Sequence, residues 1–342
     1  MTLDLPGPAL RPDLLAAGYT DEELRRARRR GEVVAVRRGA YVPSTDERLD
    51  DPAARHALAV RAAVAQLPAG AVVSHVSAAV LLGLRVWDVP LTAVHVTRDR
   101  TSGGRCGRRL HLHTTPLADG DVVEIDGVPV TAPARTVVDA ARTVPFTAGV
   151  VVADAALEAG LDPAELQEAV ERAGRRPGNA RARRVVAFAD GGGRSVGESR
   201  SRVLLARRGI PPPVLQCPVH DPQRRHVGTT DFAWPELGTV GEFDGLVKYG
   251  RLLRPGQSPG DAVVAEKRRE DRLQDEGLQV ARWTWDELDD PDVVVDRLLR
   301  AFARGDPATS RAIPGGTRAG TGASPRTPRD VARGVAGYRG RP

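Results

Sequence analysis

Three acidic residues with the spacing of an oxygen-ligand site lie between residues 229 and 248. Asp231 leads a short apolar segment, and Glu242 and Asp244 stand two residues apart in the segment that follows it. Because side chains alternate along a strand, Glu242 and Asp244 are expected on one face and Phe243 on the other. Carboxylate oxygens are the ligands that hard divalent cations prefer, so this group predicts a site for Mg²⁺ or Mn²⁺, held by Asp231 and Glu242.

Two lysines accompany these acids. The chain has 50 basic residues, of which 48 are arginines and only Lys248 and Lys267 are lysines. Their retention in an arginine-rich chain indicates that a compact ammonium is needed beside the acids. Codon bias explains the arginines, and chance placement of both lysines stays open as an alternative.

The segments around the acids predict an α/β domain. A serine-capped helix is expected first, with Glu198 in its opening turns, and Pro235–Gly238 is expected as a turn between two strands. The predicted order is a helix, a three-strand meander, a helix and a strand, over residues 195–209, 213–219, 231–234, 239–244, 261–276 and 278–285.

This order, together with Glu198, Asp231 and Glu242-x-Asp244, resembles the PD-(D/E)xK nuclease superfamily. Its small branch similar to very-short-patch-repair endonucleases is the nearest likeness. The closing helix and strand carry that likeness in Glu266-x-x-Arg269-x-x-x-Leu273-x-x-x-Gly277 and Val280-x-Arg282-Trp283. The resemblance covers roughly residues 190–303. It implies a restriction-endonuclease-like αβββαβ core and Mg²⁺-dependent phosphodiester hydrolysis. The implied catalytic residues are Glu198, Asp231, Glu242, Asp244, Lys248 and Lys267.

One departure from the superfamily leaves two hypotheses open. The third motif usually ends in lysine, and Asp244 stands in that place. Either Lys248 or Lys267 supplies the ammonium from a shifted position, or the fold is degenerate and the chain is a non-catalytic regulator. The Glu-x-Asp-Gly pattern is not specific by itself, since it recurs at Glu124–Gly127 in an expected hairpin turn.

A basic helix is predicted near the start of the chain. Thr20 caps residues 21–30, with acids at the beginning and arginines at the end, and residues 32–42 alternate like a two-strand wing. A helix, a capped helix and a wing form a winged helix-turn-helix pattern. Arginines that could then contact DNA phosphates are Arg25, Arg26, Arg28, Arg29, Arg37 and Arg38. The alternative is a basic face that is merely solvated.

The same residues resemble the N-terminal domain of type IV toxin–antitoxin antitoxins of the AbiEi kind. The likeness runs from Gly18-Tyr19-Thr20 to Arg38-Gly39-Ala40-Tyr41-Val42 and continues more faintly through Ser74-His75 and Arg135-Thr136. It implies a first domain that binds DNA and a second that opposes a nucleotidyltransferase toxin, so both are expected partners.

Three histidines in the middle of the chain raise a second metal hypothesis. His111 and His113 share one strand face, and His95 lies on an earlier expected strand. Metal sites need three or four convergent ligands, and no neighbouring carboxylate or cysteine completes this set. We therefore interpret these histidines as structural.

Length and composition indicate how many domains the chain forms. With 342 residues, 41% hydrophobic and 27% charged, the chain is expected to form several globular domains. The expected parts are a winged helix-turn-helix at 1–48, an α+β domain at 49–190, the nuclease-like domain at 191–304 and a disordered basic tail at 305–342. The tail accounts for most of the net charge of +6. Two cysteines, no leader pattern and no long apolar run favour a cytoplasmic protein without a membrane segment.

Overall fold

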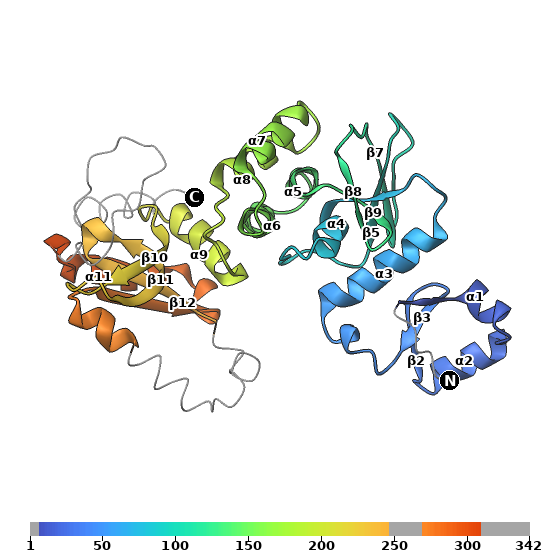
Figure 1. The fold of residues 1–342 in the computed structure, drawn as a ribbon, viewed down its shortest axis with the longest axis horizontal. Helices are drawn as coiled ribbons and strands as arrows, with labels where there is room; N and C mark the ends of the chain where they lie inside the picture. The colour runs from blue at the N-terminus through green and yellow to red at the C-terminus, as the bar shows by residue number, and fades with distance from the viewer. Residues whose placement is uncertain (1–6, 246–268, 309–342) are drawn as a thin grey trace. The chain divides into compact units, whose positions relative to one another are not determined.

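The computed structural model describes residues 7–245 and 269–308. The chain divides into two compact units, residues 1–191 and 192–342, which are described separately below (Figure 1). Helices and three β-sheets make up these units, so the predicted multidomain α/β architecture is confirmed. Within the described ranges, no helix combines the length and the apolar character needed to cross a bilayer.

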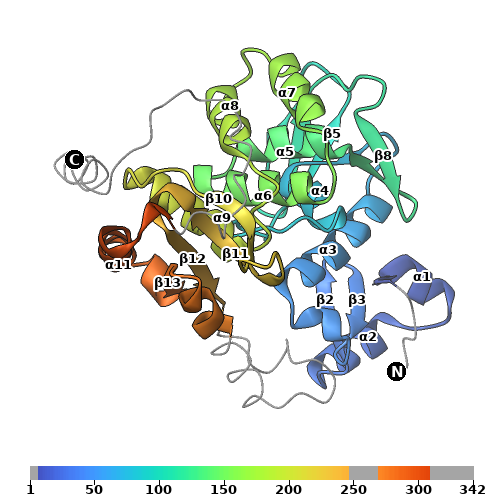
Figure 2. The same cartoon turned by 60° about the vertical axis from the view of Figure 1, so that its left-hand side comes forward.

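Unit 1 begins with two short helices and a three-stranded sheet of order β1-β3-β2. The elements are β1 (Ala9–Leu10), α1 (Arg11–Ala16), α2 (Asp21–Arg29), β2 (Val33–Arg37) and β3 (Ala40–Pro43). Thr20 caps α2 as predicted: its hydroxyl accepts from the Glu23 amide, and the Glu23 carboxylate accepts from the Thr20 amide. Leu24 and Ala27 of α2 are buried against Leu14, Val33 and Tyr41. Helix α2 lies beside β2 and β3 (Figure 2).

The rest of unit 1 is built on a six-stranded sheet of order β6-β7-β5-β4-β9-β8. Its strands are β4 (Val72–Val73), β5 (Val94–Arg98), β6 (Arg105–Cys106), β7 (Leu110–Thr114), β8 (Val122–Ile125) and β9 (Val128–Thr131). Asp126 and Gly127 join β8 to β9 with φ of 48° and 75°, as the predicted hairpin turn requires. Helix α3 (Pro52–Gln66) has the bounds that its alanine-rich sequence predicts.

One helix boundary predicted in this region is wrong. The sequence pattern predicts a helix over residues 72–82, but α4 spans His75–Leu81. Val72 and Val73 instead form β4, which pairs with Thr97 and Val96 of β5 and lies parallel to β9. Both valines are buried, so pairing within the sheet outweighs the helical periodicity of the segment.

Four helices close unit 1. They are α5 (Pro133–Ala141), α6 (Phe146–Glu158), α7 (Pro163–Arg172) and α8 (Asn179–Phe188). The sequence pattern predicts helices over residues 135–143, 148–159 and 163–173, which α5, α6 and α7 match within a few residues, whereas α8 was not predicted. Its arginine-rich sequence obscures the apolar pattern, and tertiary contacts hold it: Asn179 donates its side-chain amide to the carbonyls of Val170 and Gly174.

Unit 2 is a four-stranded sheet of order β10-β11-β12-β13 with helices packed on it. Its elements are α9 (Val196–Arg207), β10 (Val214–His220), β11 (His226–Trp234), the 3₁₀ turn η2 (Pro235–Leu237), β12 (Thr239–Asp244), β13 (Gln279–Thr284), the 3₁₀ turn η4 (Asp286–Leu288) and α11 (Pro291–Arg304). Residues 269–275 are also helical. β10, β11 and β12 are antiparallel neighbours, and β13 joins β12 in parallel.

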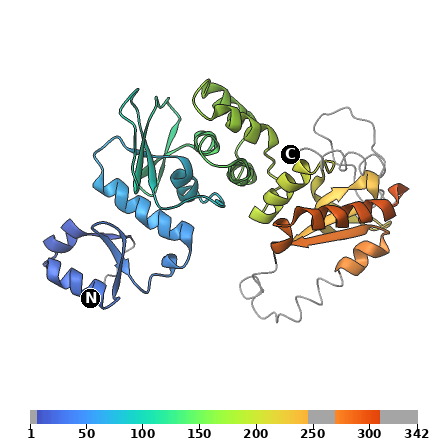
Figure 3. The same cartoon turned by 180° about the vertical axis from the view of Figure 1, so that it is seen from behind.

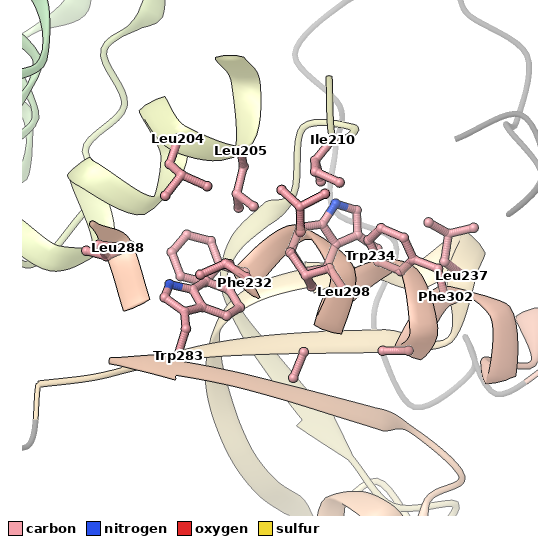
Figure 4. Packing of buried hydrophobic residues seen from close by; sticks show 14 residues of the cluster. Leu204, Leu205, Ile210, Phe232, Trp234, Leu237, Trp283, Leu288, Leu298 and Phe302 are labelled. Atoms are coloured by element: carbon pink, nitrogen blue, oxygen red, sulfur yellow. The ribbon is translucent and has the colours of Figure 1, made fainter. Parts of the chain in front are cut away.

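The larger core of unit 2 lies between the sheet and helices α9 and α11, and a smaller one joins Leu273 of the helix at 269–275 to the strands. Phe232 and Trp283 extend from the strands toward Leu204 and Leu205 of α9, whereas Trp234 lies beside Phe302 (Figure 4). Helix α11, which was not predicted, lies along β13 and adds Phe302 (Figure 3). The buried indole N–H of Trp283 donates to the Ser201 hydroxyl at 2.7 Å, which ties α9 to the sheet.

Two sequence expectations fall at the edges of the described residues. Lys248, Lys267 and the predicted tail from 309 onward lie outside them. The tail was expected to begin at 305, but residues 305 and 306 pack closely on the turn after η2. A side-chain carbon added at Gly238 would come within 2.4 Å of the Asp306 carbonyl oxygen. The packed part of unit 2 therefore continues past α11.

Candidate functional site

Three elements of unit 2 carry the predicted acids. Glu198 is in the first turn of α9, Asp231 is on β11, and Glu242 and Asp244 are on β12. We call these four residues the acid cluster. Phe232 pairs with Gly241, so the next position along the register sets Asp231 opposite Glu242. The Asp231 Oδ2 accepts the Phe243 amide at 2.9 Å, which anchors this carboxylate to the neighbouring strand.

Glu242 is the most buried acid on the two central strands and is held by two arginines. Its exposed fraction is 5%, and its two carboxylate oxygens lie 2.7 Å from Arg269 Nη2 and 2.8 Å from Arg282 Nη2. Arg282 is the register partner of Glu242 on β13. Both arginines belong to the motif that carries the nuclease resemblance, but nothing in their spacing assigned them a contact with Glu242.

Gln216 links two of the acids, and no sequence pattern pointed to it. It lies on β10 and donates its side-chain amide to Glu198 Oε2 at 2.9 Å, and it also hydrogen-bonds the Asp231 carboxylate. Its φ is +48°, an unusual conformation for a strand residue that is not glycine. Such local strain persists only where the surroundings enforce it and is frequent at functional sites. The local sequence offers no signal for this role.

Burial and negative neighbours change the protonation of the site. Burial raises the pKa of Asp231 to about 6, and the nearby Glu242 charge acts in the same direction. The Phe243 amide, Arg269 and Gln216 oppose the shift but do not cancel it. An acid with a raised pKa among other acids is a group that a cation would stabilise in its charged form.

The donor set suits a hard divalent cation in its chemistry. Carboxylate oxygens from Glu198, Asp231 and Glu242 are ligands that Mg²⁺ and Mn²⁺ prefer. At Glu242 a cation would compete with Arg269 and Arg282 for the same two oxygens. Asp231 and Glu198 would hold such an ion most directly, while Asp244 lies half-buried at the end of β12.

The predicted DNA-contacting arginines occupy exposed positions on unit 1. Arg25, Arg26 and Arg29 lie 2.8, 3.5 and 3.1 Å from the Glu22 carboxylate, and all three are more than half exposed. Such exposed pairs contribute little stability and can exchange partners easily. Arg28 and Arg38 are exposed.

Arg37 differs from the other predicted contact residues. Its guanidinium donates to the Gln66 side chain at 3.2 Å and to the Arg109 carbonyl at 3.2 Å. These bonds tie the β2 strand to α3 and to the segment before β7. Arg37 therefore has a structural role within unit 1.

The histidines predicted to be structural lie closer to one another than the sequence indicated. β5 and β7 are parallel neighbours, and His95 is paired with His111 while Thr97 is paired with His113 (Figure 1). His75, which sequence spacing does not connect with them, stacks on His113 with 3.7 Å between ring centroids. Only the packing of α4 on β5 and β7 brings it there.

Comparison with known proteins gives two relatives of limited coverage. The chain is 32% identical over 161 residues to "Uncharacterized protein Rv2248" of Mycobacterium tuberculosis strain ATCC 25618 / H37Rv. It is equally similar to "Uncharacterized protein MT2308" of strain CDC 1551 / Oshkosh. The match covers 43% of this chain and 59% of each relative, so the chain spans about three fifths of the length of the curated relatives it matches.

Family and structure comparisons add little to this. No model of a known protein family matches the chain. A solved structure titled "Crystal structure of RV2827C protein from Mycobacterium tuberculosis" aligns over 54% of this chain and 72% of its own. Its sequence identity is 19% and its TM-score is 0.36. A score at that level does not establish a shared fold.

Proposed function

We propose that the chain is a DNA-binding regulator whose second unit carries a divalent-metal site and hydrolyses phosphodiesters. The observation that supports this most is the acid cluster. In it, Gln216 bridges Glu198 and Asp231, and Glu242 stands opposite Asp231 on the neighbouring strand. Acids from a helix and two strands are brought together although their burial is costly. A structural role alone gives no reason to gather them.

The proposed chemistry follows from the residues of the acid cluster. Asp231, Glu242 and Glu198 would hold Mg²⁺ or Mn²⁺, which lowers the pKa of a bound water and polarises a phosphate. Arg269 and Arg282 would turn from Glu242 toward a phosphate oxygen, since guanidinium groups recognise phosphate and carboxylate alike. Lys248 or Lys267 would stabilise the negative charge that develops on the phosphate, with Lys267 the preferred candidate.

The finer fold assignments belong to the same proposal. The order α9, three antiparallel strands, a helix and the parallel strand β13 supports a restriction-endonuclease-like core. Helices α1 and α2 with the β2–β3 hairpin support a winged helix-turn-helix in unit 1. DNA would then contact the exposed arginines of α2, and a nucleotidyltransferase toxin is the proposed protein partner.

The ion pairs of Glu242 favour a second function. Both of its oxygens are in ion pairs with Arg269 and Arg282, an arrangement that stabilises the fold without a metal. Asp244 also stands where the resembling nucleases carry lysine. These features support a non-catalytic antitoxin or repressor that retains the nuclease shape.

Metal uptake and DNA cleavage separate the two functions. Calorimetry with Mg²⁺ or Mn²⁺ should show uptake by the full chain, and a supercoiled plasmid should be nicked in the same buffer. Asp231→Asn should abolish both, whereas Asp275→Asn, at an exposed position of the same unit, should change neither. Uptake without nicking would support the regulator, and the absence of uptake would end the nuclease proposal.

DNA binding has its own test. Arg28→Glu combined with Arg29→Glu should weaken binding to duplex DNA of any sequence. The slope of log affinity against log salt concentration should fall in magnitude by about 1 for each phosphate that is no longer bound. Arg172→Glu is the matched control, because Arg172 is an exposed arginine on α7 of the same unit. Equally weakened binding in both variants would contradict a specific role for α2.

A further inference from the structure

Three histidines converge in unit 1 from three separate elements. His75 begins α4, His95 is on β5 and His113 is on β7. One ring nitrogen from each can be chosen so that all three lie within 4.8 Å of one another. We call these residues the histidine triad. His95 Nδ1 and His113 Nε2 are only 3.1 Å apart, a separation typical of a shared proton or a shared cation.

The orientation of His75 is fixed by its surroundings. Its Nδ1 lies 2.9 Å from the Ser74 hydroxyl, which also accepts a hydrogen bond from Thr97 at 2.8 Å. This contact leaves Nε2 as the ring nitrogen that can face a ligand. His75 also has a φ of +55°, and it is 3% exposed. A hydrogen-bonding partner on the far nitrogen is the usual way in which a ligating histidine is oriented.

The three rings of the triad are buried or half-buried, which disfavours their charged forms. Burial lowers the pKa of His95 to about 3 and that of His113 to about 4, and it lowers the pKa of His75 as well. The nearby charges are largely balanced, because Asp139 accepts from Arg135 at 2.7 Å and from Arg142 at 2.9 Å, and Asp121 also pairs with Arg135. A cation between the rings would take the place of the proton that His95 and His113 share.

A pocket gives access to the triad. It has a volume of about 630 Å³, and His75 and His113 are in its lining together with Cys106, His111, Arg142 and Arg176. A ligand bound between the histidines would therefore face this pocket on one side. Three protein ligands with one open position are the arrangement of a catalytic or ligand-exchanging zinc centre rather than of a closed structural site.

We propose that His75, His95 and His113 bind a transition-metal cation of the Zn²⁺ class, with a fourth position open to the pocket. Imidazole nitrogen suits Zn²⁺, Co²⁺, Ni²⁺ and Cu²⁺, whereas Mg²⁺ and Ca²⁺ prefer oxygen. Tetrahedral Zn–N bonds of about 2.0–2.1 Å place ligand nitrogens roughly 3.4 Å apart. The His95–His113 pair, at 3.1 Å, already approaches this spacing, and the other pairs, which lie within 4.8 Å, would close through ring rotations.

The test uses the full chain carrying Asp231→Asn, so that metal uptake by the acid cluster does not contribute. After metal removal, one equivalent of Zn²⁺ should bind, and Co²⁺ should give the visible absorption of a four-coordinate site with three nitrogen ligands. His113→Ala should remove both signals. Ser74→Ala should weaken the affinity by about 10- to 100-fold, because it loosens His75 without removing a ligand.

Controls separate the triad from other histidines. His226→Ala removes an exposed histidine of unit 2, and His111→Ala removes the imidazole beside the triad, so both should keep one equivalent of metal. A chain that takes up no Zn²⁺ and shows no Co²⁺ spectrum overturns the proposal, and so does a folded His113→Ala variant with full uptake. If His113→Ala does not fold, the Zn²⁺ stoichiometry and Co²⁺ spectrum of the chain with an intact triad decide the matter alone.

Discussion

The acid cluster of unit 2 and the histidine triad of unit 1 offset the free-energy cost of burying ionisable groups in different ways. In the acid cluster, the charge of Glu242 is met by Arg269 and Arg282, and Gln216 bridges Glu198 and Asp231. In the triad, burial keeps the rings neutral, so that they can lie in contact without a counterion. Carboxylates therefore require partners from the fold itself, whereas imidazoles can avoid the cost of burial by losing a proton.

The largest effect is expected from removing a counterion of the acid cluster. Arg282→Met should lower the free energy of unfolding by about 3 to 5 kcal/mol, because the buried Glu242 loses one of two cations. Arg297→Met is the control: Arg297 pairs with Glu287, whose side chain is 26% exposed against 7% for Glu242, so its loss should cost about 1 kcal/mol or less. Urea denaturation measures both, and equal costs would show that the Glu242 ion pairs behave like surface pairs.

The next effect depends on pH and on metal. Because the pKa of Asp231 is raised to about 6 from its usual 3.8, the folded protein holds a proton between roughly pH 4 and 6 that the unfolded chain releases. The stability that comes from protonated Asp231 is therefore fully present below about pH 4 and is lost as the pH rises through 6. The shift of about two pKa units corresponds to roughly 3 kcal/mol.

Asp231→Asn should remove this dependence. Above pH 7 and without metal, the variant should be more stable than the natural chain by up to about 3 kcal/mol, and the two should converge near pH 4. Saturating Mg²⁺ should reverse the order at pH 7, since only the natural chain gains from binding. Denaturation curves at several pH values check this, and parallel pH profiles would show that Asp231 is not buried in its charged form.

A smaller effect concerns the helix that carries Glu198. A methyl group at Gly197 would lie 1.9 Å from Phe243 Cε1, so Gly197→Ala should push α9 away from β12. Overpacking should cost about 1 to 3 kcal/mol, although alanine normally favours a helix by about 1 kcal/mol over glycine. Metal uptake at the acid cluster should weaken with it while Zn²⁺ uptake at the triad stays unchanged. A stabilised Gly197→Ala variant would contradict the packing of α9.

The smallest effect is expected in the triad without metal. His113→Phe keeps the stack on His75 and removes one hydrogen bond to His95, so its cost should be about 1 kcal/mol or less. Thermal denaturation of the metal-free chain measures it. A cost near that of Arg282→Met would show that the triad, like the acid cluster, depends on charged partners.

The sequence by itself determined the elements with strong local signals. The Thr20 cap defines the start of α2, Asp126-Gly127 defines the β8–β9 turn, and the alternation at 239–244 defines β12. These features depend on hydrogen bonds and backbone preferences between residues a few positions apart, which a sequence displays directly. The grouping of Asp231 with Glu242 followed from the same local hairpin.

Tertiary structure alone decided the partners of those residues. Arg282 meets Glu242 only because β13 joins β12 in parallel, Gln216 reaches two acids through a strained strand position, and His75 meets His113 across α4 and β7. Each contact joins residues that are far apart along the chain, and burial rather than local propensity holds them. Sequence spacing carries no record of such contacts, because the packing of whole elements determines which distant side chains meet.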